Sequence, residues 1–386
     1  MKKTEFLTSR ERVIRTIEHK STDRYPIDLG MHFSSGISAF AYYNLRKYLG
    51  LSADSVEIAD TVQILARVDT DILEAFHCDT LLLRPKWEKT VKWSPKPGFD
   101  FVIPQKMNPL LDENGCWHVR DGDMAMSMPP GSCFFDGDWL QVNELDADEY
   151  IRQTAKEAER IHKETDYFTS FLSLNAYFEG MDFACDMYTD PESIIERNKS
   201  LHAENMRLVT DLIKHAGEYI DGIVLAGDLG TQNGPICAPE LYEELCAPFL
   251  KELCSLIHDC SAMKIQLHSC GSIDPFIPCI IDSGVDVLNP VQISADGMDP
   301  QTLKNKYGDK ICFWGGGCNT QHVLPVKPPD EVRKNVRELT DIFKVNGGFV
   351  FNAVHNIMGE VPPENIAAMY EAAYENSFYE NFGSKV

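Results

Sequence analysis

Two side chains that commonly bind metals, His268 and Cys270, lie two residues apart at the end of the stretch Met263–Gly271. In an extended strand alternate side chains point to opposite faces, so His268 and Cys270 share one face and the apolar residues share the other. A neutral imidazole and a thiolate are ligands that zinc prefers. The pattern predicts half of a zinc site. The alternative is a histidine and a cysteine that only pack and form hydrogen bonds.

Further ligands must come from other strand ends. Cys318 follows the run Trp314–Gly317, and His355 follows Phe349–Asn352. Either one completes a three-residue set, and the sequence leaves the choice open. Asp228 also follows an apolar run, so it is a candidate ligand or acid/base, or only the cap of a turn.

Loops after other strands have the composition of a substrate site. The glycine-rich segment Gly227–Gly234, which contains Gln232, allows a ligand to approach the backbone closely. Asn175–Gly180 offers aromatic rings to a flat substrate and a carboxylate for proton transfer, although core packing is the commoner role of such rings. The residues assigned to substrate binding are Tyr177, Phe178, Gln232, Asn289 and Trp314, and the catalytic candidates are Asp228, Glu179 and His32. A lone histidine such as His32 is more often structural.

These residues follow short apolar runs that alternate with helical patterns, which is typical of parallel strands joined by crossover helices. Eight such runs predict strands at 25–29, 78–83, 167–174, 222–226, 263–268, 285–288, 311–314 and 348–351. Helices are predicted at 36–48, 55–76, 191–215, 239–258, 275–283, 300–307, 329–345 and 362–375. The fold class is therefore α/β, a closed (β/α)8 TIM barrel with the site at the carboxyl ends of its strands. A doubly wound sheet would favour a glycine-rich phosphate turn after the first strand, which is absent.

Residues 85–148 interrupt this alternation. The segment contains four tryptophans, many prolines and a hairpin signal at Asn114-Gly115. This composition predicts a β-rich insertion after strand two, packed over the barrel mouth. Without a repeat or a linker, residues 1–386 are expected to form a single domain with 85–148 as an inserted lobe.

Charge and cysteine usage exclude several classes of partner. The formal net charge of −23 disfavours nucleic acid and anionic membranes as partners. Twelve scattered cysteines, no signal-peptide pattern and no apolar stretch of roughly 18 residues indicate a cytoplasmic protein. A homodimer is an assembly that the sequence leaves open.

The chain resembles the uroporphyrinogen decarboxylase superfamily, specifically its branch of cobalamin-linked methyltransferases from anaerobes. The resemblance covers nearly the whole chain and rests on the order and spacing of several motifs. These are Arg10–Val13, Asp23–Pro26, Gly227–Gln232, His268–Ser272, Gly284–Gln292, Phe313–Cys318 and Val361–Ile366. It implies a (β/α)8 barrel.

The resemblance also separates two activities. True decarboxylases carry an essential aspartate in a Phe-Ser-Asp-Ile segment at the end of strand two, whereas this chain reads Leu83-Arg84-Pro85-Lys86. Relatives that methylate a thiol hold zinc with His, Cys and a second Cys near the last strand. Here His355 stands at about that third place, which favours enzymes that remove a methyl group from a substrate.

The resulting hypothesis is a metal-assisted, O-demethylase-type methyltransferase. It moves a methyl group between a small molecule, a methoxylated aromatic or a methylated amine, and the cobalt of a separate corrinoid protein. Zinc is the expected metal, and the partner supplies the cobalamin, because no Asp-x-His-x-x-Gly signature is present. The alternatives are a lyase that decarboxylates a carboxylated substrate without metal, and a non-catalytic binding barrel.

Overall fold

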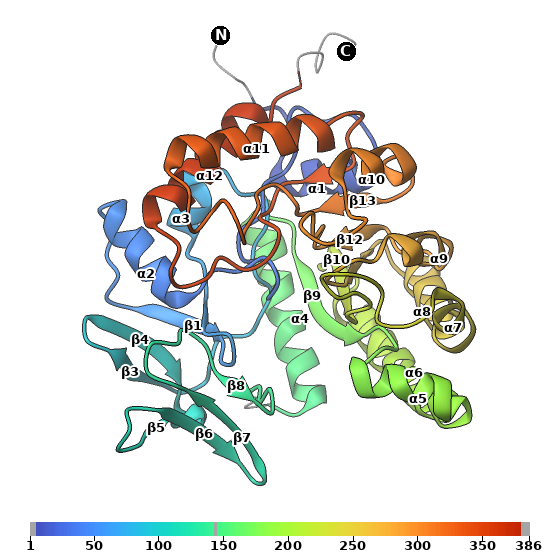
Figure 1. Ribbon diagram of the computed structural model, residues 1–386, viewed down its shortest axis with the longest axis horizontal. Helices are drawn as coiled ribbons and strands as arrows, with labels where there is room; N and C mark the ends of the chain where they lie inside the picture. Colours follow the sequence, from blue (N-terminus) through green and yellow to red (C-terminus); the bar gives the residue numbers. More distant parts are fainter. Residues whose placement is uncertain (1–4, 143–144, 380–386) are drawn as a thin grey trace.

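A computed structural model describes residues 5–142 and 145–379. Its centre is a parallel sheet with the strand order β14-β13-β12-β11-β10-β9, so consecutive strands lie side by side (Figure 1). The strands are β9 (Ser170–Asn175), β10 (Gly222–Ala226), β11 (Lys264–His268), β12 (Val287–Asn289), β13 (Cys312–Trp314) and β14 (Phe349–Val350). They correspond to the last six predicted strands, with ends that differ by a few residues. The α/β class with a parallel sheet is thereby confirmed.

The first two predicted strands, 25–29 and 78–83, form isolated bridges instead of strands. Ile27 bridges Phe351 and Thr80 bridges Phe168, each in parallel. The Asp79 N–H donates to the Ile27 carbonyl at 2.7 Å. The Asp79 side chain accepts a hydrogen bond from the Ile27 N–H at 2.8 Å. This bond occupies a backbone donor that regular pairing between two strands would require. These bonds continue the hydrogen bonding beyond both edge strands of the sheet.

Helices connect the consecutive strands, as the sequence predicts. They are α5 (Met181–Thr189) and α6 (Pro191–Ala216) after β9, α7 (Pro239–Leu245) and α8 (Ala247–Cys260) after β10, η2 (Asp274–Phe276) and α9 (Ile277–Asp282) after β11, α10 (Pro300–Tyr307) after β12, α11 (Pro329–Phe343) after β13, and α12 (Pro363–Asn376) after β14. Asp190 and Asp299 cap α6 and α10 by accepting backbone N–H bonds, and a proline follows each cap. The predicted helix 239–258 is divided at Cys246.

The helices bury one face each against the sheet. In α11 the buried residues Val332, Val336, Leu339 and Phe343 recur every three or four positions, which places them on one side. Charged residues occupy the other side. Within residues 5–142 and 145–379, no helix is both long and apolar enough to cross a membrane.

The predicted helix 55–76 is wrong. The segment instead forms β1 (Val56–Asp60), β2 (Leu65–Ala66) and α3 (Thr70–Ala75). Val56 and Ile58 are buried while Glu57 between them is partly exposed, an alternation typical of a strand. The Asp60 carboxylate then accepts the N–H groups of Val62 and Gln63, and this turn ends the strand.

Besides α3, three helices of the described residues precede the strands of the parallel sheet. These are α1 (Ser9–Ile17), α2 (Ala39–Tyr48) and α4 (Ala147–Glu164). Only α2 corresponds to a predicted helix. Asp146 caps α4 through the Glu149 N–H, and this helix precedes β9.

Residues 85–142 carry most of the remaining strands. These are β3 (Thr90–Lys96), β4 (Phe99–Pro104), β5 (Leu110–Leu111), β6 (Trp117–Asp121), β7 (Met124–Met128) and β8 (Asp136–Gly137), with η1 (Gln105–Met107) between β4 and β5. Together with β1 and β2 they form the sheets β2-β1-β4-β3 and β5-β6-β7-β8, which Figure 1 shows to one side of the parallel sheet. The turn at Asn114-Gly115 joins the antiparallel strands β5 and β6. Residues 143–144 of the predicted lobe lie outside the described residues.

A buried ion network ties the first helix to the start of segment 78–83. Arg12 contacts Asp79 at 2.5 Å and Asp23 at 2.8 Å, and Arg24 contacts Asp79 at 2.7 Å. All four side chains are almost fully buried. Burial opposes ionisation of Asp23, but hydrogen bonds from Arg12 and the Phe6 N–H outweigh it and lower the Asp23 pKa to about 2.

Candidate metal centre and adjoining cavity

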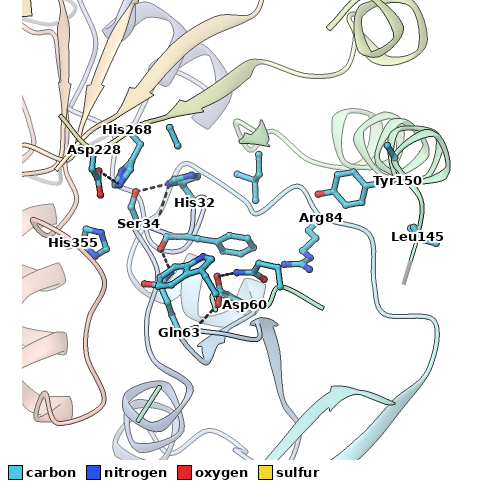
Figure 2. Close-up of a pocket in the computed structure, with 16 residues that line it drawn as sticks. His32, Ser34, Asp60, Gln63, Arg84, Leu145, Tyr150, Asp228, His268 and His355 are labelled. Atoms are coloured by element: carbon cyan, nitrogen blue, oxygen red, sulfur yellow. Dashed lines mark hydrogen bonds and ion pairs between the residues drawn. The ribbon is translucent and has the colours of Figure 1, made fainter. Parts of the chain in front are cut away.

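A cavity of about 620 Å³ opens where the strands of the parallel sheet end. Its volume lies within the usual range for small-molecule sites. It is lined by His32, Phe33, Ser34, Asp60, Gln63, Arg84, Trp139, Gln141, Leu145, Ala147, Tyr150, Leu172, Ala226, Asp228, His268 and His355. Figure 2 shows the histidines and Asp228 on one side of this cavity, with Arg84, Tyr150 and Leu145 on the other.

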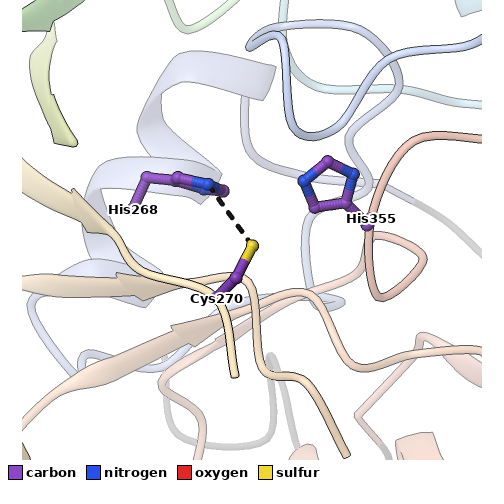
Figure 3. Close-up of side chains that lie close together, drawn as sticks. All are labelled: His268, Cys270 and His355. Carbon is purple, nitrogen blue, oxygen red and sulfur yellow. Dashed lines mark hydrogen bonds between the residues drawn. The ribbon is translucent and has the colours of Figure 1, made fainter. Parts of the chain in front are cut away.

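Three potential metal ligands, His268, Cys270 and His355, lie close together (Figure 3), and the two histidines line the cavity. His268 ends β11, Cys270 lies in the turn that follows, and His355 belongs to the loop after β14. Their ligand atoms all lie within 4.8 Å of one another, and Cys270 Sγ is 3.6 Å from His268 Nε2. Bonds of about 2.0 Å to nitrogen and 2.3 Å to sulfur place two tetrahedral ligand atoms about 3.5 Å apart, so this pair has suitable spacing.

Asn289 fixes the orientation of the His268 ring. The Asn289 amide donates to the Trp314 carbonyl at 3.1 Å, which turns its Oδ1 atom toward His268 Nδ1, also at 3.1 Å. Because Oδ1 only accepts, His268 Nδ1 must carry the proton. The lone pair of Nε2 then points toward Cys270, as metal binding requires.

A short chain of polar contacts extends from Asn289 to His32. Ser34 Oγ lies 2.6 Å from Asn289 Oδ1 and 2.6 Å from His32 Nδ1. The His32 ring centroid is 5.6 Å from that of His268. Three histidines from three segments therefore face one wall of the cavity.

Burial keeps two of these imidazoles neutral. Loss of hydration, followed by repulsion from His268, lowers the pKa of His355 to about 4. Burial likewise holds the pKa of His32 well below its ordinary value. At neutral pH both rings therefore keep a free nitrogen lone pair.

Asp228 is the carboxylate nearest to the group. Its Oδ1 atom lies 3.6 Å from His268 Nε2 and accepts the Cys270 N–H at 2.8 Å. Burial, and then the neighbouring Asp228 charge, raise the pKa of the Cys270 thiol. Without a cation the thiol stays protonated, and a bound cation would favour the thiolate.

Cys318 does not join this group. Its side chain is fully buried within the apolar core, and burial raises its pKa. A thiol surrounded by hydrocarbon behaves as a small apolar side chain. Of the two candidates for the third ligand, the structure brings only His355 to His268 and Cys270.

The loop after β9 turns its predicted site residues away from the cavity. Tyr177 is fully buried, with its hydroxyl 2.8 Å from His202 Nδ1 on α6. Phe178 packs edge-on against Phe183 of α5. Glu179 forms an ion pair with Arg197 of α6. These three side chains face helices and do not line the cavity.

Three further predicted substrate residues, Asn289, Gln232 and Trp314, also lie outside the cavity lining, and Asn289 is fully buried. Gln232 accepts a hydrogen bond from Gln292 at 3.0 Å and donates to the Ser294 carbonyl, so it braces neighbouring loops. Trp314 is buried beneath the site and donates to the fully buried Asp28 at 2.8 Å. Gln232 and Trp314 can act on the site only through their neighbours.

Several lining residues escaped the sequence reasoning. Arg84 directly follows the segment 78–83, while Asp60 and Gln63 come from the segment 55–76, for which the sequence predicts a helix. Gln141 comes from the segment between β8 and α4, and Tyr150 comes from the first turn of α4. A cation directly after an apolar run was the available signal for Arg84. The sequence around Gln141 contains no comparable signal.

The fold and site define an α/β protein in which residues at the ends of parallel strands line a cavity beside a His-Cys-His cluster. A sequence profile of the uroporphyrinogen decarboxylase (URO-D) family matches residues 184–376, half of the chain. The chain belongs to this family. The matched region contains all three residues of the cluster.

Individual relatives are distant. Uroporphyrinogen decarboxylase from Geotalea daltonii is 24% identical over 42% of this chain and 45% of its own length. The enzyme of the same name from Methylococcus capsulatus is 27% identical over 26% of this chain and 27% of its own length. The chain thus spans less than half the length of these curated relatives. A methyltransferase from Methanosarcina mazei shares the fold, with a TM-score of 0.59, 13% identity and coverage of 96% of this chain and 99% of that one.

Proposed function

We propose that this protein is a methyltransferase that moves a methyl group between a small molecule and the cobalt of a corrinoid protein. The observation that carries the proposal is the cluster of His268, Cys270 and His355, of which both histidines line an open cavity. The fold shared with a methyltransferase is consistent with this function. A cytoplasmic location is part of the same proposal.

We also propose that the chain is one closed (β/α)8 barrel with residues 85–148 as an inserted lobe. The bridges of Ile27 to Phe351 and of Thr80 to Phe168 support this, together with the Asp79–Ile27 hydrogen bond. The two segments would stand between the edge strands β14 and β9. The site would then lie at the carboxyl ends of the barrel strands, where enzymes of this architecture have their active sites.

The donor set fits a zinc ion. Imidazole nitrogens and a thiolate are common zinc ligands, and three protein ligands leave a position open for a substrate, as in catalytic sites. His268, Cys270 and His355 would hold the ion. When bound, zinc supplies Lewis-acid chemistry that stabilises developing negative charge on a leaving group.

The residues around the cluster position the substrate and manage a proton. In methyl transfer from an ether, the carbon–oxygen bond breaks as the partner's cob(I)alamin forms a carbon–cobalt bond. The electron pair of the broken bond stays on the oxygen, which then takes a proton that comes ultimately from the solvent. Asp228 and His32 line the cavity within reach of such an oxygen, whereas Glu179 does not. Asp228 is therefore the proposed proton carrier, assisted by His32.

Methylation of a corrinoid protein tests this function directly. A cob(I)alamin-loaded corrinoid protein is mixed with the zinc-loaded enzyme and a panel of methoxyaromatics, methylamines and methanol, and the cobalt absorbance is followed. We expect methylcobalamin to form with at least one methoxylated aromatic, and a chelator to abolish its formation. No methylation with any donor would overturn the proposal.

A decarboxylase that works without metal is the second candidate. The names of the curated relatives favour it. At the end of segment 78–83, however, this chain reads Leu83-Arg84-Pro85-Lys86 and lacks the aspartate that the resemblance leads us to expect in decarboxylases. Release of CO₂ from a carboxylated substrate, unaffected by a chelator, would establish this alternative.

Asn289 is expected to act as a positioning residue for the cluster. Asn289→Ala removes the acceptor that holds His268 Nδ1–H, so zinc affinity should fall by roughly 10-fold to 100-fold. Competition with a chromogenic chelator measures this change. Asn365→Ala is the matched control, because Asn365 is a buried amide that donates to Leu324 and Lys327 carbonyls away from the cavity. Equal zinc affinity in both variants would show that Asn289 does not position His268 for zinc binding.

A further inference from the structure

Arg84 is a buried cation at the cavity wall opposite the histidine cluster. Only 6% of the residue is exposed. Its guanidinium carbon lies 5.3 Å from the centre of the Phe33 ring and 4.4 Å from that of Trp87. Aromatic faces attract a cation and hold a planar guanidinium in one orientation. Arg84 is thus fixed in position by packing.

This guanidinium has few protein partners. Within residues 5–142 and 145–379, it forms no ion pair, and its one hydrogen bond goes to the Ala59 carbonyl. A guanidinium carries five N–H donors, so most of them are left over. Burial lowers the pKa of Arg84, which reflects the cost of keeping this charge out of water. A buried cation without an anion is strongly unfavourable unless a ligand supplies one.

The acidic side chains nearby do not meet this need. Asp60 accepts bonds from the Val62 and Gln63 N–H groups and from Gln141 at 2.9 Å. Asp228 accepts the Cys270 N–H at the opposite wall. The other ion pair in this region joins Arg67 to Glu57. Arg84 therefore remains available to a molecule in the cavity.

The cavity between the two walls suits a flat apolar body. Phe33, Trp139, Tyr150 and Leu172 contribute rings and hydrocarbon to its lining. Arg84 lies on one side and His268 with His355 on the other (Figure 2). A ligand that fills this space would place one end at the cation and the other at the cluster.

We infer that Arg84 binds the carboxylate of the substrate, so that the substrates are methoxylated aromatic carboxylates with the methoxy group directed toward His268, Cys270 and His355. This inference rests on the proposed function. A carboxylate matches the planar fork of a guanidinium through two parallel hydrogen bonds. A phosphate dianion is less suitable because Asp60 and Asp228 share the cavity. A methylated ammonium would be repelled by Arg84.

Equilibrium binding tests the inference without any methyl transfer. The affinities of the full-length enzyme for 4-methoxybenzoate and for the neutral 4-methoxybenzamide are compared by calorimetry. Wild-type protein should bind the carboxylate at least about 10-fold more tightly, given ~1.5–3 kcal/mol for hydrogen bonds to a charged group. Arg84→Met should weaken carboxylate binding by about 10-fold to 100-fold and change amide binding by less than about 3-fold. Arg84→Lys should restore part of the loss.

Arg152→Met is the control for the loss of one positive charge. Arg152 is exposed on α4 and pairs with Glu149 outside the cavity lining. Its substitution should leave both affinities unchanged. Equal affinity of wild-type protein for acid and amide overturns the inference, even where Arg84→Met fails to fold. Charge-selective binding without methyl transfer from any donor would instead uphold the role of Arg84 and refute the proposed methyltransferase.

Discussion

Cys270→Ala should remove bound zinc and lower the rate of methyl transfer by about 10³-fold. The expectation follows from the cluster, because loss of one of three protein ligands leaves too few donors for a stable site. Lewis-acid stabilisation of several kcal/mol is then lost, and about 4 kcal/mol corresponds to roughly 10³ in rate. His268→Ala should act in the same way. Metal content by elemental analysis and corrinoid methylation by absorbance measure the two effects.

Two matched cysteine controls accompany this experiment. Cys260 is an exposed free thiol at the end of α8, and Cys318 is a buried thiol in the apolar core. Cys260→Ala and Cys318→Ala should retain zinc and activity, whereas His355→Ala should lose both. Retention of zinc by His355→Ala together with its loss in Cys318→Ala would reverse the assignment of the third ligand.

Asp79→Ala should lower the free energy of unfolding by about 3–5 kcal/mol. The substitution removes the carboxylate that the buried cations Arg12 and Arg24 share, and leaves Arg24 with only the partly exposed Glu5. Removal of one partner from a buried ion pair costs about this much. It also removes the bond from the Ile27 N–H. Urea denaturation followed by circular dichroism measures the change.

An exposed aspartate provides the comparison. Asp54 lies at the surface, where its carboxylate accepts only the Ser52 hydroxyl at 3.0 Å. Asp54→Ala should change stability by less than about 0.5 kcal/mol. A loss of the same small size for Asp79→Ala would mean that the ion network contributes nothing beyond a surface interaction.

The sequence predicted best those site residues whose direction is set by the alternation of side chains along a strand. His268 occupies an inward position of β11, and the residues after the later strands could be assigned to the same end of the sheet because parallel strands finish together. His355 was thereby found. The choice between His355 and Cys318 needed the structure, because loop conformation, rather than alternation, decides which side chain returns to the cavity.

Side-chain alternation does not extend into the loop after β9. Alternation ends at Asn175, and Tyr177 has φ of +65° in the left-handed region, so the chain turns its aromatic side chains toward the helices. Tyr177 and Glu179 therefore meet α6 partners instead of a substrate. The sequence predicts a helix for 55–76 because its apolar residues fit both the helical period and the strand period over short stretches.

The segment 78–83 links two separate roles across a few residues. Asp79 at its start anchors two buried arginines, while Arg84 directly after its end lines the cavity. The groups that hold the molecule together are thus spatially divided from those that select a ligand. Descendants of this chain could exchange Arg84 and the surrounding loops, and so acquire new specificities, while the anchor beneath preserved the scaffold.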